Sequence, residues 1–196
     1  MNLSDVYLQC VRDVLDLYAS ADDDRLLAPI RFSPQWNGHQ LLCHLAGASS
    51  DLATGRLDGA PSPAWTARQV KERAGSSVSE LSAEFAGNAE TVASQCEERS
   101  GPVPAWDVSV HTGDLYESWS LPTMPKGLEL GWSPVLVDCL AFLTGVNALP
   151  GKLVTASGEI WGAPSGVPTM VTSDYELFRA LFGRRPRSAI ADNVGP

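Results

Sequence analysis

Apolar residues recur every three to four positions through much of the chain, which is the spacing of amphipathic helices. From Ser4 to about Ser20 they fall on one helical face, at positions 7, 8, 11, 14, 15 and 18. Similar segments, separated by glycine and proline, predict further helices over 38–54, 66–73, 77–98 and 105–119. The pattern therefore predicts a mainly α protein whose helices pack as a bundle.

Local signals place several helix ends. Asn37 is a good N-cap, and Gln40 stands three residues later, where it completes a capping box. Ser133 and Pro134 are typical of an N-cap and a first helical position, so they predict a strongly apolar helix that runs to about Asn147. The acidic run at residues 22–24 is expected to form an exposed loop.

The pattern changes after residue 150. Short β-prone segments separated by glycine and proline turns predict strands at 152–156, 159–161 and 168–172. Ser173 then opens a last helix, which ends at Gly183, and residues 187–196 are expected to fray. We therefore expect two domains: a helical bundle over 1–149 and a small C-terminal α+β appendage over 150–196.

Composition narrows the function. The formal charge of -9 and the pI of about 4.7 disfavour nucleic acid and anionic membrane surfaces as partners. The chain starts without a basic and apolar leader, and no later run approaches the roughly 18 apolar residues of a membrane span. Its cysteines are isolated from one another, so reduced and mostly buried thiols are expected at positions 10, 43, 96 and 139. A cytoplasmic protein is predicted, and its oligomeric state is left open.

The segment 105–119 carries the chemistry that distinguishes this chain. Asp107 and His111 are four residues apart, so a helix brings them to one face, close enough to bind one ion. His44 is the best candidate for a third ligand. Two histidines and one carboxylate leave coordination positions open for water or substrate. The alternative to a metal site is that His44 is an ordinary core histidine and that Asp107 and His111 only form a surface contact.

Four blocks in the same order resemble the mycothiol-dependent maleylpyruvate isomerase family, a branch of the DinB-like metal-binding helical bundles. They are Trp36 with His39–Gly47, then Pro63–Val70, then Asp107–His111 with Asp114 and Leu115, and finally Leu177–Arg185. The resemblance implies a four-helix-type bundle that binds a divalent metal and uses a low-molecular-weight thiol. The metal ligands of the family would fall on His44, Asp107 and His111. Asp107 stands where glutamate is often found, so metal identity is not carried over.

The resemblance implies mycothiol or a similar thiol as cosubstrate, and zinc, nickel or iron as the metal, with zinc preferred. Four arginines lie within nine residues near the C-terminus and would suit a small anionic substrate or thiol. We predict that Arg184 is catalytic and that Arg179 and Arg185 bind the cofactor. The alternative for each arginine is that it complements the dipole of the last helix.

The resulting hypothesis is a metal- and thiol-dependent S-transferase or cis/trans isomerase that acts on a small electrophile, expected to be anionic. A metal-bound thiolate would attack the electrophile. Three alternatives remain open: a metal-dependent hydrolase, a noncatalytic bundle that binds a metal or ligand, and a structural protein without metal.

Overall fold

A computed structural model of the chain describes residues 2–98, 103–146, 152–154, 158, 160–162 and 173–186. The chain divides into two compact units, Met1–Gly131 and Trp132–Pro196. The domain boundary expected between residues 149 and 150 lies outside the described residues and stays a prediction. The two units are described separately below.

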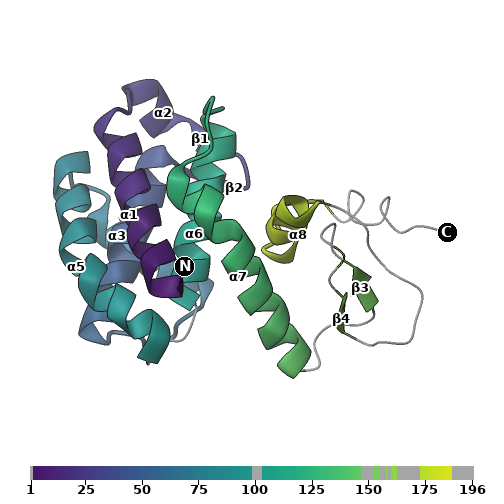
Figure 1. Cartoon of the computed structure of the whole chain (residues 1–196). Coiled ribbons are helices and arrows are strands. Elements are labelled where there is room, and N and C mark those ends of the chain that lie inside the picture. Colours follow the sequence, from purple (N-terminus) through teal and green to yellow (C-terminus); the bar gives the residue numbers. More distant parts are fainter. Residues whose placement is uncertain are drawn as a thin grey trace. The chain divides into compact units, whose positions relative to one another are not determined.

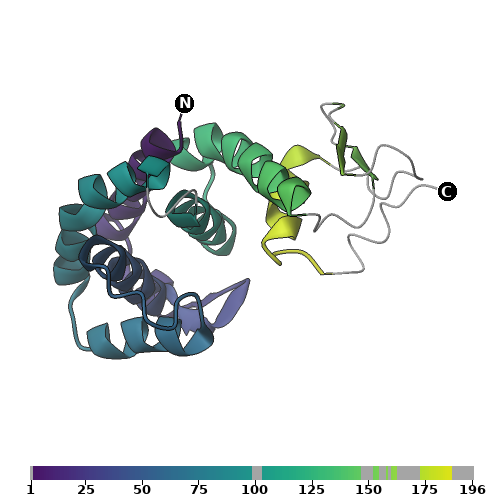
Figure 2. The ribbon, with the colours of Figure 1, turned by 90° about the horizontal axis from the view of Figure 1, so that it is seen from below.

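The first unit is a bundle of long helices (Figure 1). Helix α1 packs against α5 and α6, and α3 packs against α4, α5 and α6. In Figure 2, α6 lies on the inner side of the arc that α1, α5 and α3 form. The mainly α bundle is thus confirmed, with α1 (Leu3–Ala19), α3 (Gly38–Thr54), α4 (Pro63–Arg73), α5 (Val78–Glu98) and α6 (Val103–Ser118).

The core of this unit is built from the apolar stripes that the sequence shows. Fully or almost fully buried side chains come from α1, α3, α5 and α6, as the 3.6-residue period requires. They include Val6, Val14, Leu41, Leu45, Leu81, Phe85, Val92, Val108 and Leu115.

Helix α3 starts as the sequence predicts, with Asn37 as its N-cap. The Asn37 side chain accepts a hydrogen bond from the backbone N–H of Gln40 at 2.9 Å, and the Gln40 side chain accepts one from the backbone N–H of Asn37 at 3.0 Å. This capping box fixes the first turn of the helix that carries His44.

Residues 22–24 are exposed as expected, but the loop predicted for them is wrong. Asp22 instead caps a short helix, α2 (Asp23–Leu27), by accepting a hydrogen bond from the backbone N–H of Arg25. Strands β1 (Pro29–Ile30) and β2 (Ser33–Asn37) then pair antiparallel. Five helical residues are too few to show a helical period, which explains why the pattern missed α2.

Helix α7 (Lys126–Gly145) begins well before Ser133, where the sequence predicted its start. The stabilising group comes from α1, because the carboxylate of Asp13 accepts a hydrogen bond from the backbone N–H of Gly127 in the first turn. Pro134 lies inside the helix. Among the described residues, α7 is the one helix long and apolar enough to cross a membrane, with a mean hydropathy of 1.3. Core helices of soluble proteins meet the same criterion, so this is weak evidence for a membrane span.

The second unit contains the C-terminal part of α7, a two-stranded sheet and α8. Strands β3 (Lys152–Val154) and β4 (Ile160–Gly162) pair antiparallel, and α8 (Asp174–Leu181) starts at the predicted N-cap Ser173. Gly183 follows with φ of 72°, a left-handed conformation that suits glycine after a helix. The strand predicted at 168–172 and the frayed end at 187–196 lie outside the described residues.

Candidate metal centre

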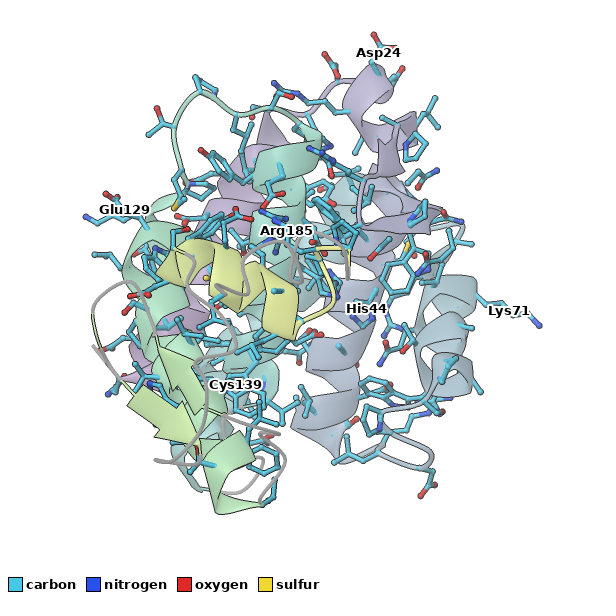
Figure 3. The ribbon with its side chains drawn as sticks, turned by 90° about the vertical axis from the view of Figure 1, so that its right-hand side faces the viewer. Asp24, His44, Lys71, Glu129, Cys139 and Arg185 are labelled. Carbon is cyan, nitrogen blue, oxygen red and sulfur yellow. The ribbon has the colours of Figure 1, made fainter. Side chains whose placement is uncertain are left out.

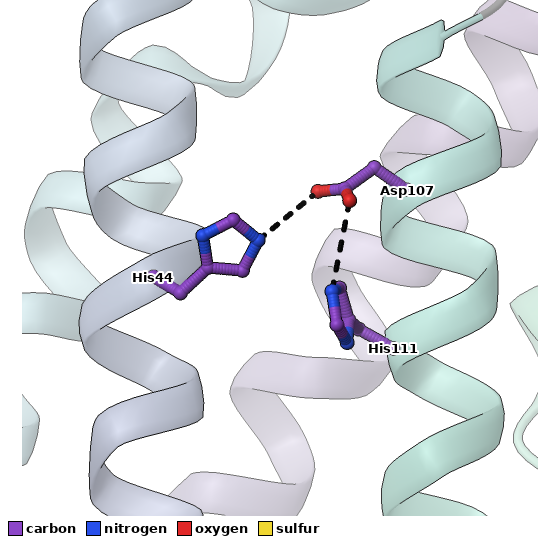
Figure 4. A group of neighbouring side chains, drawn as sticks. All are labelled: His44, Asp107 and His111. Atoms are coloured by element: carbon purple, nitrogen blue, oxygen red, sulfur yellow. Dashed lines mark ion pairs between the residues drawn. The ribbon is translucent and has the colours of Figure 1, made fainter. Parts of the chain in front are cut away.

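Three side chains from two helices meet inside the first unit (Figure 4). His44 comes from α3, and Asp107 and His111 come from successive turns of α6. Each offers one ligand atom, and these atoms all lie within 4.8 Å of one another. Both histidines are buried, whereas the side chain of Asp107 keeps 40% of its surface exposed. The cluster is therefore anchored on the imidazole side and open on the carboxylate side.

The separations within this triad suit a shared cation. Nε2 of His44 lies 3.6 Å from one carboxylate oxygen of Asp107, and Nε2 of His111 lies 3.6 Å from the other. Both distances are longer than a hydrogen bond between such groups. Ligands that surround a tetrahedral metal at about 2.0–2.2 Å are themselves roughly 3.3–3.6 Å apart. The donor set of two imidazoles and one carboxylate also suits a divalent transition metal.

The imidazole of His44 is oriented from behind by helix α4. Its Nδ1 lies 2.8 Å from Oε1 of Gln69, and Nε2 of Gln69 donates to Asp51 at 2.9 Å. Because the amide N–H of Gln69 is committed to Asp51, its oxygen faces His44, so Nδ1 carries the proton and Nε2 keeps its lone pair. Arg68 also donates to Asp51, at 2.8 Å. Lys71, also on α4, extends away from the bundle (Figure 3).

Gly47 allows α4 to approach this closely. A Cβ atom at this position would lie 2.6 Å from Cβ of Gln69 and 2.9 Å from its Cγ. Any larger residue would therefore push Gln69 away from His44. Gly47 is the last residue of the family-like block His39–Gly47, and the close approach of α4 explains why a glycine is needed there.

The second imidazole is oriented by its own helix. Nδ1 of His111 lies 3.0 Å from Oδ2 of Asp114, whose side chain is completely buried. Since a carboxylate only accepts hydrogen bonds, Nδ1 donates and Nε2 faces the triad. Asp114 is thus a buried carboxylate that orients His111.

Trp36 covers both histidines. Its ring centroid lies 4.9 Å from that of His44 and 6.1 Å from that of His111. The β1–β2 hairpin, which the sequence did not predict, brings this side chain to the start of α3. An aromatic wall beside the triad limits the access of water from that direction.

An apolar pocket of about 400 Å³ adjoins the triad, and Asp107 is part of its lining. Tyr7, from α1, also lines it. Burial, together with the nearby Cys96 and Asp107, raises the pKa of Tyr7, so its phenol stays protonated at neutral pH.

The three arginines assigned from the sequence belong to the second unit. Arg185 forms a two-point ion pair with Glu176, at 2.5 and 2.8 Å. Arg184 donates to the carbonyl of Phe182, and Arg179 is completely buried. The Arg185–Glu176 pair joins the segment after α8 to the first turn of that helix. The catalytic role of Arg184 and the cofactor-binding roles of Arg179 and Arg185 stay predictions.

Sequence reasoning missed Gln69 and Asp51 as parts of the site. Both are polar and almost fully buried, with 0% and 3% of their surface exposed. Gln69 lies inside the block Pro63–Val70. A glutamine on the buried face of an amphipathic helix was the available signal, because such a group needs hydrogen-bond partners.

Comparison with known proteins agrees with this geometry. The sequence model of the mycothiol maleylpyruvate isomerase N-terminal domain matches residues 7–124, a span that includes the hairpin, α3, α4 and α6. Searches of the curated proteins and of the solved structures gave no significant match. The matched span is more than half of the chain and contains the complete His/Asp/His triad. The chain therefore belongs to the family of the mycothiol maleylpyruvate isomerase N-terminal domain.

Proposed function

We propose that this protein is a metal- and thiol-dependent enzyme that transfers a low-molecular-weight thiol of the mycothiol type to a small electrophile or isomerises it. The observation that carries the proposal is the convergence of His44, Asp107 and His111, at separations that fit one divalent cation. Zinc is the first choice of metal, with nickel and iron as alternatives.

A bound divalent cation would lower the pKa of a coordinated thiol and supply it as thiolate at neutral pH. The protein's own side chains orient the metal ligands and leave space for the reactants. Gln69 and Asp114 hold both imidazoles with Nε2 toward the centre, so neither ring has to reorient when a cation enters. The exposed side of Asp107 leaves room for the thiol and the electrophile.

The reaction itself follows from the thiolate. Its sulfur would form a bond to the electrophilic carbon of an activated alkene, and the alkene electrons would move onto the conjugated carbonyl oxygen. If a proton is then added at the α-carbon, the product is the thioether. If the adduct instead rotates about the former double bond and expels the thiolate, the result is cis/trans isomerisation.

The protein's own cysteines are unsuited to be the nucleophile. Burial raises the pKa of the Cys10 thiol to about 12 and that of the Cys43 thiol to about 11. Both thiols are therefore protonated at neutral pH, and neither belongs to the triad. This supports a small thiol as the nucleophile. The four free cysteines also support a reducing, cytoplasmic location as part of the proposal.

The test combines elemental analysis with a thiol assay. Protein purified without a histidine tag and reconstituted with zinc, nickel or iron should hold one metal ion per chain, and His111→Ala should lose it. The matched control is His39→Ala, which removes a histidine of α3 whose ring lies 2.8 Å from the carbonyl of Ser76 instead of in the triad.

Activity is then followed as thiol-dependent consumption of an enone. Wild type and His39→Ala should consume it, and His111→Ala should not. A metal-bound protein that consumes esters or amides with water but ignores thiol would be a hydrolase. A protein that binds metal without either reaction would be a noncatalytic binding bundle. Each of these results would overturn the proposal.

A further inference from the structure

The pocket beside the triad is apolar on almost every side. Its wall comes from five helices, α1, α3, α4, α5 and α6, and from the α3–α4 connection. It includes Leu45, Leu52, Leu57, Trp65, Phe85 and Val108. A volume of about 400 Å³ is within the range of small-molecule sites. Ala48 also lines it, one helical turn after His44, so the pocket continues directly from the triad along α3.

The polar groups of this pocket are few. The Ser49 hydroxyl already donates to the carbonyl of Ala46 at 2.8 Å, and the indole N–H of Trp65 donates to the carbonyl of Arg56 at 3.4 Å. Asp107 and Tyr7 are the other lining residues that carry a polar side-chain group. Among the described residues that line the pocket, there is no lysine, arginine or histidine.

This lining determines which ligands are favourable. At the end of the pocket away from the triad, a carboxylate would lose its hydration without meeting a cationic side chain. A hydrocarbon group gains about 0.8 kcal/mol for each methylene removed from water, which is roughly a fourfold gain in affinity. The pocket is therefore selective for uncharged, apolar groups.

We propose that this pocket binds the apolar, uncharged tail of the electrophilic substrate, so that the substrate is a neutral enone or similar acceptor with a hydrocarbon substituent. The assignment of the ligand as a substrate rests on the proposed function, whereas the selectivity of the pocket does not. The tail occupies the space between Ala48 and Leu57, and the reactive carbon lies at the end that Asp107 shares with the triad. The anionic substrate expected from the C-terminal arginines is the competing outcome.

The test uses a matched pair of ligands. Octan-2-one and 7-oxooctanoate share the ketone and the chain length, and they differ only in the group at the far end. Isothermal titration calorimetry on zinc-loaded protein should give a Kd for octan-2-one that is at least about tenfold lower than the Kd for 7-oxooctanoate. Shortening the ketone to pentan-2-one should weaken binding by roughly fourfold for each methylene removed. Equal or tighter binding of 7-oxooctanoate would overturn the proposal.

Two variants test the location. Leu57→Asp places a carboxylate at the mouth of the pocket, at a residue that is already 43% exposed, so folding should be little affected. This substitution should weaken the binding of octan-2-one at least tenfold. The control Leu27→Asp makes the same change at a residue of α2 that is 70% exposed and does not line the pocket. Equal effects of the two changes would place the ligand elsewhere. Ala48→Leu, which fills part of the pocket from α3, should also weaken the binding of octan-2-one.

Turnover separates this inference from the proposed function. With a saturating thiol, oct-3-en-2-one should have a higher kcat/KM than 7-oxooct-5-enoate. A preference for the carboxylate would overturn the pocket assignment while leaving a thiol enzyme. No thiol-dependent turnover of either compound, together with selective binding of octan-2-one, would refute the enzyme and retain the apolar pocket.

Discussion

Replacing Gln69 with leucine tests how the protein prepares the triad. The side chain is completely buried and joins Nδ1 of His44 at 2.8 Å to the carboxylate of Asp51 at 2.9 Å. Leucine has a similar volume, so the change removes hydrogen bonds without opening a large cavity. In the variant the N–H of His44 loses the Gln69 oxygen that accepts its hydrogen bond, and the preference for this tautomer weakens.

The expected losses follow from these two bonds. A buried donor that loses its partner costs about 1–3 kcal/mol. The lost hydrogen bond to Asp51, which retains Arg68, costs about 1 kcal/mol more. The free energy of unfolding should therefore fall by about 2–4 kcal/mol. Groups that orient metal-ligating histidines change metal affinity by about 10- to 100-fold, which corresponds to roughly 1.4–2.7 kcal/mol. Zinc affinity should fall within that range.

Two measurements give these quantities independently. Urea unfolding of the metal-free protein gives the change in stability, and competition with a chromophoric chelator gives the zinc Kd. Gln35→Leu is the control, because Gln35 is exposed on β2 and the same substitution there should change neither quantity much. A Gln69→Leu protein that is less stable but binds zinc as tightly as wild type would refute an orienting role for Gln69.

Three further changes probe the surroundings of the triad. Gly47→Ala places a Cβ 2.6 Å from Cβ of Gln69, so the free energy of unfolding, measured by urea denaturation, should fall by about 1–3 kcal/mol. The control is Gly87→Ala, which has open space around it and should raise the free energy of unfolding by about 0.5–1 kcal/mol. Asp114→Asn removes the charge that orients the histidine of α6, and chelator competition should show roughly tenfold weaker zinc binding; unchanged affinity would contradict its role. Burial raises the pKa of Cys43 from 9.0 to about 11, so its contribution to stability is complete below pH 9 and is lost as pH rises through 11. At pH 8 its alkylation by iodoacetamide should be far slower in the folded protein than in urea, and equal rates would contradict the burial argument.

The sequence predicts most of the first unit because its helices bury one face each. The stripe on α1 and the Asn37–Gln40 capping box are local signals, and the structure has both where they are expected. The early start of α7 was missed because its cap, Asp13, lies more than a hundred residues earlier in the chain. No local pattern can reveal such a partner.

The candidate site shows the same division. Asp107 and His111 can be paired from their spacing, because one turn of helix brings them together. The contribution of His44 depends on how α3 and α6 pack, so the sequence makes it a candidate and the geometry brings it within reach. The contacts of Gln69 with His44 and Asp51 depend on how α4 packs against α3, so the sequence does not show them.

The central claim is that His44, Asp107 and His111 hold one divalent cation whose remaining positions face the apolar pocket. A crystal structure of the zinc-loaded protein, with diffraction recorded on both sides of the zinc absorption edge, tests this claim directly. The account predicts one strong anomalous peak about 2.0–2.2 Å from Nε2 of each histidine and from an Asp107 oxygen. A zinc peak at other residues, or no peak at the triad with zinc in excess, would contradict it.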